Sequence, residues 1–139
     1  MTPRELIQTW FQRVWSQQDA SAIDEFFVPD GQAHGLGDNP LIGPKQFRVF
    51  HQMMCSLLKD IEIEVDKGIE EGAWTAVLCT LKAQCTRSGK PVSMTGNVWF
   101  HIEDGKILEG YNHWDFFGLF GQLDLVPEET FGRALAGQR

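Results

Sequence analysis

Apolar residues recur at helical spacing in three stretches of the first half of the chain. The first stretch opens with Thr2-Pro3-Arg4-Glu5, in which Thr serves as N-cap, Pro suits the first helical position and Glu closes a capping box. These signals predict helices from about Pro3 to Gln18, briefly from Ser21, and from about Pro44 to Lys59. The apolar face of the first helix consists of Leu6, Ile7, Trp10, Phe11, Val14 and Trp15, and that of the last consists of Phe47, Phe50, Met53, Met54, Leu57 and Leu58.

Beyond Lys59 the apolar positions alternate with polar ones, as they do in strands that expose one face. We predict four strands, at about 61–66, 73–86, 92–102 and 106–115, joined by short turns. Consecutive strands joined in this way form an antiparallel meander. The remaining segments are expected to be a turn at Val28–Gly31, a loop with at most one short strand at Gln32–Gly43, and one or two short helices between Gly118 and about Leu135.

Helices followed by an antiparallel sheet predict an α+β fold, and the length of the chain suits a single domain, residues 1–139. The apolar helical faces must cover one face of the sheet, because an exposed apolar face of that size is unfavourable in water. If the sheet is curved, the space between helices and sheet becomes a cone-shaped cavity in which a ligand would bind.

Charge and hydropathy narrow the classes of partner. The formal net charge of −7 disfavours a sequence-independent nucleic-acid surface, since such a surface needs clustered Lys and Arg. No apolar run approaches the roughly 20 residues that span a bilayer, so we expect no membrane partner. The N-terminus lacks the basic start and apolar core of a signal peptide, and we therefore expect a cytoplasmic protein.

The residues that usually hold metals and phosphates are too scattered to predict such a site. The histidines form no H-x-H or H-E-x-x-H motif, and the cysteines form no C-x-x-C motif. The lone G-x-G at Gly35–Gly37 follows no strong strand, which argues against a phosphate loop. We expect no metal and no cofactor, and we interpret Cys55, Cys79 and Cys85 as buried reduced thiols.

Four stretches, in order along the chain, carry a resemblance to a known family. They are Phe26–Asp30, Ile42–Phe47, Glu103–Ile107 and, most specifically, Asp115–Leu123, which is similar to a D-x-x-G-x-x-x-Q-L ending. In this combination they resemble the SnoaL-like polyketide cyclases, a group within the NTF2-like, or cystatin-like cone, fold. The resemblance implies an α+β cone that is commonly a homodimer, with the outer face of the sheet, here bearing Trp99, as a plausible contact surface.

The resemblance also implies positions for catalytic residues. In the cyclases an Asp on the last strand acts as general acid/base on a polyketide carbon, a His and a Gln on the preceding strand assist, and an Asn lies in the loop after the second helix. A gap-free alignment from Asp104-Gly105 places Asn112, Val98, Gly96 and, approximately, Ala33 at these positions. An amide cannot exchange a proton near neutral pH, so Asn112 cannot replace a carboxylate as base.

The last strand offers another carboxylate, Asp115. Many relatives carry His-Trp-Asp here, and the chain has His113-Trp114-Asp115, so a local bulge would bring Asp115 into the cavity as the base. His113 shares a strand face with Asp115 and could pair with it or polarise a carbonyl. The alternative interpretation makes Asp115 a cap for the turn into the segment at Gly118, and His113 an exposed or interface residue.

Strand alternation, combined with the resemblance, predicts an apolar cavity whose main polar groups are Asn112 and Trp114. The glycines at 96 and 110 leave room for a flat ligand. His34, in a glycine-rich loop near the expected mouth, is either a substrate contact or an exposed loop histidine. The expected substrate contacts are Trp10, His34, Met54, Gly96, Val98, Phe100 and Trp114.

Two hypotheses follow for function. The first is a SnoaL-like cyclase or related isomerase that transfers protons next to the carbonyl of a small apolar, polyketide-like compound, with Asp115, His113 and Asn112 as catalytic residues. The second is a non-catalytic module of the same fold that binds a small apolar ligand or serves in dimerisation, because the usual acid/base position holds Asn112.

Overall fold

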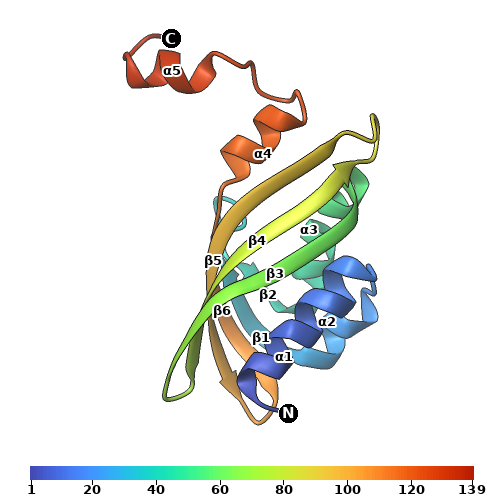
Figure 1. Ribbon diagram of the computed structural model, residues 1–139. Coiled ribbons are helices and arrows are strands. Elements are labelled where there is room, and N and C mark those ends of the chain that lie inside the picture. Colours follow the sequence, from blue (N-terminus) through green and yellow to red (C-terminus); the bar gives the residue numbers. More distant parts are fainter.

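The computed structural model describes all residues from Met1 to Arg139, and it is built around one strongly curved sheet (Figure 1). The strands β3 (Leu58–Glu71), β4 (Trp74–Cys85), β5 (Pro91–Glu103) and β6 (Lys106–Trp114) form an antiparallel meander. The whole sheet has the strand order β2-β1-β6-β5-β4-β3, and the N-terminal helices pack on its concave face. The predicted α+β fold with a curved sheet is therefore confirmed.

The three N-terminal helices form as their apolar spacing predicted, with one difference in kind. Helix α1 (Pro3–Trp10) starts at Thr2, whose hydroxyl accepts the Glu5 N–H at 3.1 Å, and it continues directly into a π-helix, η1 (Phe11–Ser16). Helices α2 and α3 cover Ser21–Phe26 and Gly43–Leu57. None of the helices has both the length and the apolar character needed to cross a membrane.

Helix α3 ends two residues before the predicted end at Lys59. The chain turns extended at Leu58 and enters β3, which is longer than the predicted strand at 61–66 because it continues as an exposed ribbon to Glu71. Leu58 is fully buried and also pairs with Cys85 on β4, so packing and strand pairing both favour the extended conformation at this residue.

The segment expected to be a turn and a loop contains two strands instead. Strand β1 (Phe27–His34) runs parallel to β6 and antiparallel to β2 (Leu41–Ile42), so the sheet is not purely antiparallel. The pairing of β1 shifts register between Phe27 and Gln32, and this irregular part contains Pro29 and Gly31. Proline and glycine are tolerated in strands at such bulges, which explains why a turn-like sequence forms a strand here.

The core forms two apolar clusters that meet beneath the sheet. One lies mainly between α1, α2 and the β1 end of the sheet, and the other lies between the C-terminal part of α3, the start of β3, and α4 (Phe116–Gln122). Trp15, Ile63 and Trp114 pack against both clusters. Two of these three side chains are indoles, so aromatic rings bound part of the interior between the clusters.

The cysteines fit the interpretation as reduced thiols, with one exception in burial. All three are free, Cys79 and Cys85 are buried, and Cys55 is only half-buried. Burial raises the pKa of the Cys79 thiol to about 12. Cys79 therefore stays protonated at neutral pH and cannot act as a nucleophile.

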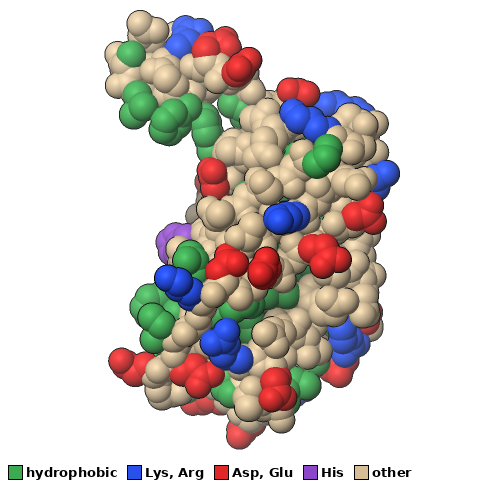
Figure 2. Space-filling view, in the orientation of Figure 1, with side chains coloured by type: hydrophobic (Ala, Val, Ile, Leu, Met, Phe, Trp, Pro, Cys, Tyr) green, Lys and Arg blue, Asp and Glu red, His purple; other side chains and the backbone are tan.

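The C-terminal residues leave the body of the molecule after α4. Helix α5 (Thr130–Leu135) projects beyond the edge of the sheet, and Figure 2 shows apolar side chains gathered on one side of this segment. One or two short helices were expected from Gly118 onward, and the structure has two, the first of which begins two residues earlier, at Phe116. Leu125, Phe131 and Leu135 remain exposed there.

Candidate functional site

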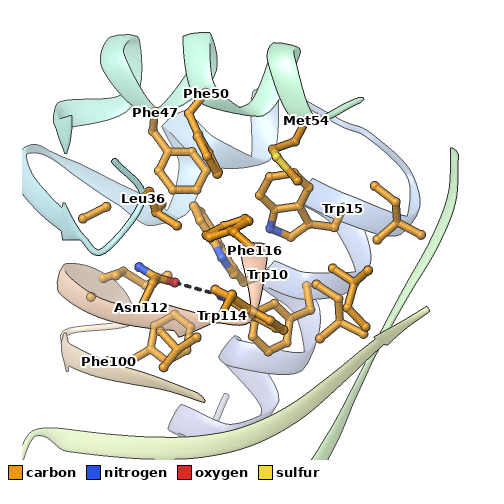
Figure 3. Close-up of a pocket in the computed structure, with 18 of the residues that line it drawn as sticks. Trp10, Trp15, Leu36, Phe47, Phe50, Met54, Phe100, Asn112, Trp114 and Phe116 are labelled. Carbon is orange, nitrogen blue, oxygen red and sulfur yellow. Dashed lines mark hydrogen bonds between the residues drawn. The ribbon is translucent and has the colours of Figure 1, made fainter. Parts of the chain in front are cut away.

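A cavity lies between the concave face of the sheet, helix α1 with its π-helical continuation, and α3 (Figure 3). It measures about 50 Å³ and sits within a concavity of about 680 Å³ that opens to solvent. Of its 21 lining residues, 19 are hydrophobic. A single water needs roughly 10–15 Å³, and a cavity that binds benzene measures about 150 Å³. The present space is therefore smaller than a ring needs, and a ring would enter only where the wall gives way.

The polar side-chain groups of the cavity wall that form hydrogen bonds belong to Asn112 and Trp114. The Asn112 amide donates from Nδ2 to the His34 carbonyl at 3.0 Å, and its Oδ1 accepts from Trp114 Nε1 at 3.4 Å (Figure 3). Each bond leaves capacity for a ligand, because an amide nitrogen has two hydrogens and an amide oxygen has two lone pairs. No side chain that lines the cavity is titratable.

Gly35 makes the contact between Asn112 and β1 possible. Its φ of +86° is unfavourable for other residues, and a Cβ on it would lie 1.8 Å from the Asn112 carbonyl oxygen. The chain can therefore pass directly against β6 at this point. This close approach holds the His34 carbonyl where the Asn112 amide reaches it.

Several predicted substrate contacts do lie in the cavity wall. Figure 3 shows Trp10 and Met54 pointing inward from the helices, with Phe100 and Trp114 opposite them on the sheet. Val98 lines the wall next to Asn112, with which it pairs across β5 and β6.

Gly96 and His34 do not contact the cavity, which corrects two of the predicted contacts. A Cβ at Gly96 would lie 2.5 Å from Trp114 Cε3, so this glycine lies beneath the indole ring and makes room for it rather than for a ligand. The His34 imidazole lies against Tyr111, with ring centroids 4.5 Å apart and planes nearly parallel, and Nε2 is 3.1 Å from Gln32 Oε1. Only the backbone of His34 belongs to the site.

The predicted catalytic group of Asp115, His113 and Asn112 is not brought together. Strands β5 and β6 pair regularly from Val98 opposite Asn112 to Gly96 opposite Trp114, so no bulge rotates the end of β6. The Asp115 carboxylate is exposed and accepts the Gly118 N–H at 2.9 Å as the N-cap of α4. His113 is exposed on the outer face of the sheet. The structure supports the capping interpretation of Asp115.

The D-x-x-G-x-x-x-Q-L ending is explained by how it fixes helix α4. Gly118 lies so close to Asp115 that a Cβ on it would be 2.3 Å from the carboxylate Oδ2. The Gln122 amide pairs with the backbone of Ser93, accepting its N–H at 2.9 Å and donating to its carbonyl at 2.7 Å, and Leu123 is buried. These bonds attach α4 to β5 and so place Phe116 at the cavity.

Three half-buried side chains of the cavity wall, Leu36, Phe50 and Phe116, were not among the substrate contacts predicted from the sequence. Phe116 lies edge-on to Phe50 of α3, with ring centroids 6.3 Å apart, and Leu36 lies nearby in the loop after β1 (Figure 3). Phe116 has the same strand parity as Asn112 and Trp114, and that signal was available in the sequence. Leu36 has no such signal, because its place depends on the path of the loop.

Replacing Asp115 tests its structural role. We expect Asp115→Ala to lower the free energy of unfolding by about 0.5–2 kcal/mol through loss of the cap, whereas Asp115→Asn retains a capping oxygen and stays near wild type. Urea titrations would measure both. Equal destabilisation by both variants would contradict the capping role, because Asn and Asp cap helices about equally well.

The comparisons with known proteins agree with this architecture. The sequence matches the family described as SnoaL-like polyketide cyclase over residues 5–123. A structure from Jannaschia sp. CCS1, of a protein proposed to be a SnoaL-like polyketide cyclase, is 18% identical, with a TM-score of 0.77 over 91% of this chain and 98% of that one. IdmH from Streptomyces antibioticus, also proposed to be a polyketide cyclase, is 20% identical, with a TM-score of 0.74 over 89% and 99%.

A third structure names the fold. It is a hypothetical protein from Catenulispora acidiphila with a ketosteroid isomerase-like fold, 14% identical, with a TM-score of 0.76 over 91% of this chain and all of the other. A search among curated proteins finds no match. The family match covers most of the sequence, and the chain belongs to the SnoaL-like polyketide cyclase family.

Proposed function

We propose that the protein binds a small, flat, largely apolar molecule in the cavity without a general acid or base from the cavity wall. The observation that carries this proposal is the composition of the wall, which holds 19 hydrophobic residues among 21 and no titratable side chain. A charged ligand would lose its hydration there without gaining a counter-ion. An aromatic ring would keep favourable contacts with the surrounding rings.

Asn112 and Trp114 determine which polar group the proposed ligand must carry. The second Nδ2 hydrogen and the free lone pair of Oδ1 suit one hydroxyl or carbonyl on an otherwise apolar ring. A ligand of ring size or larger requires Phe50 and Phe116 to separate, which their partial exposure at the cavity makes feasible.

Family membership favours a second candidate, a cyclase that activates a carbonyl compound. In this chain the Asn112 amide would donate a hydrogen bond to a developing oxyanion, as amide side chains do in oxyanion holes. The proton would have to leave to water or to the substrate itself, because Asp115 and His113 lie outside the cavity wall. This requirement makes ligand binding the better-supported function.

Filling the cavity should prevent binding. Met54 lines it, whereas the neighbouring Met53 is exposed, so Met54→Trp and Met53→Trp form a matched pair. With 2-naphthol as probe in a fluorescence titration, we expect Met54→Trp to raise the Kd at least about tenfold, a loss of about 1.4 kcal/mol, and Met53→Trp to change it less than twofold. Thermal melts would establish that both variants fold. Equal affinities for the two variants would place the ligand elsewhere.

The choice between binding and catalysis can be tested with 2-tetralone, a flat ketone with exchangeable protons next to its carbonyl. We expect the wild type to leave its deuterium exchange, followed by NMR, at the rate of buffer alone. Asn112→Asp should accelerate the exchange at least tenfold, because a carboxylate in an apolar wall has a raised pKa and acts as a base closer to neutral pH. Acceleration by the wild type that is lost in Asn112→Leu would favour the cyclase instead.

We also propose that the outer face of the sheet forms a homodimer contact. Leu78, Trp99 and Tyr111 are 45%, 52% and 38% exposed on this face, and clustered large apolar side chains mark interaction surfaces. We expect Trp99→Lys to shift sedimentation velocity from dimer to monomer, whereas Met53→Lys, at an exposed position on α3, should leave the dimer intact. A wild-type monomer at micromolar concentration would reject the proposal.

A further inference from the structure

The π-helix η1 determines which side chains of the first helix reach the cavity. In a regular α-helix each residue advances about 100°, so residues five apart point about 140° away from each other. In a π-helix, hydrogen bonds join residues five apart, and their side chains come nearly into line. Trp10 and Trp15, which are five apart at the entry to η1, both line the cavity.

The π-helical turn therefore places Trp15 inside. Its ring lies edge-on to Phe47 and Phe50 of α3, with centroids 6.3 Å and 6.2 Å away, and it packs against both core clusters. In an α-helical continuation Trp15 would lie at the margin of the apolar face, further from Trp10. The cavity would then be wider on this side.

A π-helical end leaves buried carbonyl groups that need donors from elsewhere. The Val14 carbonyl lies in the last turn of η1, and Val14 is fully buried. His51 of α3, only 5% exposed, supplies the bond, with Nε2 at 2.7 Å from this oxygen. The same imidazole packs against the Trp15 ring, with centroids 4.9 Å apart.

The bond between His51 and the Val14 carbonyl also shows that the neighbouring thiol, Cys55, is not an activated nucleophile. Cys55 Sγ lies 3.5 Å from the same Nε2. Because a carbonyl can only accept, Nε2 must carry its hydrogen toward Val14 and cannot take the thiol proton. Burial raises the pKa of Cys55 as well. His51 therefore cannot act as a base that activates the Cys55 thiol. The role that is left for the imidazole is to donate a hydrogen bond to the Val14 carbonyl.

We propose that His51 is a positioning residue, whose bond to the Val14 carbonyl holds the π-helical turn and thereby sets Trp15 as the wall that limits ligand size. The effect of Trp15 on ligand size rests on the proposed binding function. The structural part of the proposal, the dependence of the π-helix on His51, is independent of any ligand.

The experiment compares wild type with His51→Leu, which removes the donor, His51→Gln, whose Nε2 can replace it, and Gln52→Leu, an exposed neighbour on the same helix. We expect crystal structures of His51→Leu to show an α-helical turn at residues 11–16 with Trp15 displaced from the cavity. With the Trp15 wall withdrawn, the Kd of 2-naphthol should fall at least tenfold in His51→Leu, while that of phenol, a single ring, changes less than threefold. His51→Gln should return the 2-naphthol Kd most of the way to the wild-type value, and Gln52→Leu should match wild type.

The outcomes separate the two proposals. A His51→Leu structure that keeps the π-helix and the Trp15 position overturns the role of His51, whatever the binding data show. An unchanged or raised Kd of 2-naphthol in His51→Leu overturns the effect on ligand size, because a withdrawn wall would admit the larger ring system. Failure of the wild type to bind either probe, with the helix changed in His51→Leu, rejects only the binding function.

A measurement on the wild type covers the case in which His51→Leu does not fold. Nitrogen-15 NMR of labelled histidine should show His51 Nε2 protonated at pH 8, with a slowly exchanging hydrogen. An unprotonated Nε2 would overturn the inference, since it could not donate to the Val14 carbonyl.

Discussion

The pairing register between β5 and β6 is the constraint on which the site depends. Successive side chains on a strand point to opposite faces, so a shift by one residue would exchange every inward and outward group. With Val98 opposite Asn112 and Gly96 opposite Trp114, the amide and the indole face the cavity, while His113 is turned outward. Regular pairing up to Trp114 also means that the chain leaves the sheet before Asp115. Its carboxylate then caps a helix, and the cavity has no ionisable group.

A neutral cavity is also the arrangement that this fold stabilises most easily. An unpaired carboxylate among aromatic rings would lose its hydration and shift its pKa rather than remain charged. Asn has nearly the shape of Asp, and Asn112 satisfies its amide with one backbone carbonyl and one indole N–H. The resemblance to the cyclases places their acid/base at this position. An amide here keeps the hydrogen-bonded frame and gives up proton exchange.

Sequence periodicity could predict most of the fold and half of the site, because those parts follow from alternation alone. The meander, the helices, and the inward positions of Val98, Phe100 and Asn112 all depend on which residues share a face. Strand β1 was missed because Pro29 and Gly31 have the composition of a turn, and its pairing with β6 joins residues far apart in the sequence. Gly96 was predicted to contact the ligand because the sequence shows that a side chain is missing there, but it does not show that the Trp114 ring occupies the space. The π-helix had no sequence signal, since Trp15 also fits the apolar stripe of an α-helix.

Two kinds of residue thus shape this cavity, and they differ in what their replacement would change. Asp115, Gly118 and Gln122 hold α4 through bonds to backbone, so their replacement lowers the stability of the fold whatever the ligand. Asn112, Trp15 and Phe116 line the cavity, so a change at any of them also alters which molecule fits. A family signature made mainly of residues that hold the fold together can identify the fold, while the chemistry of the cavity differs between members. That division explains why the strongest motif of this chain, Asp115–Leu123, lies almost entirely outside the cavity that it helps to close.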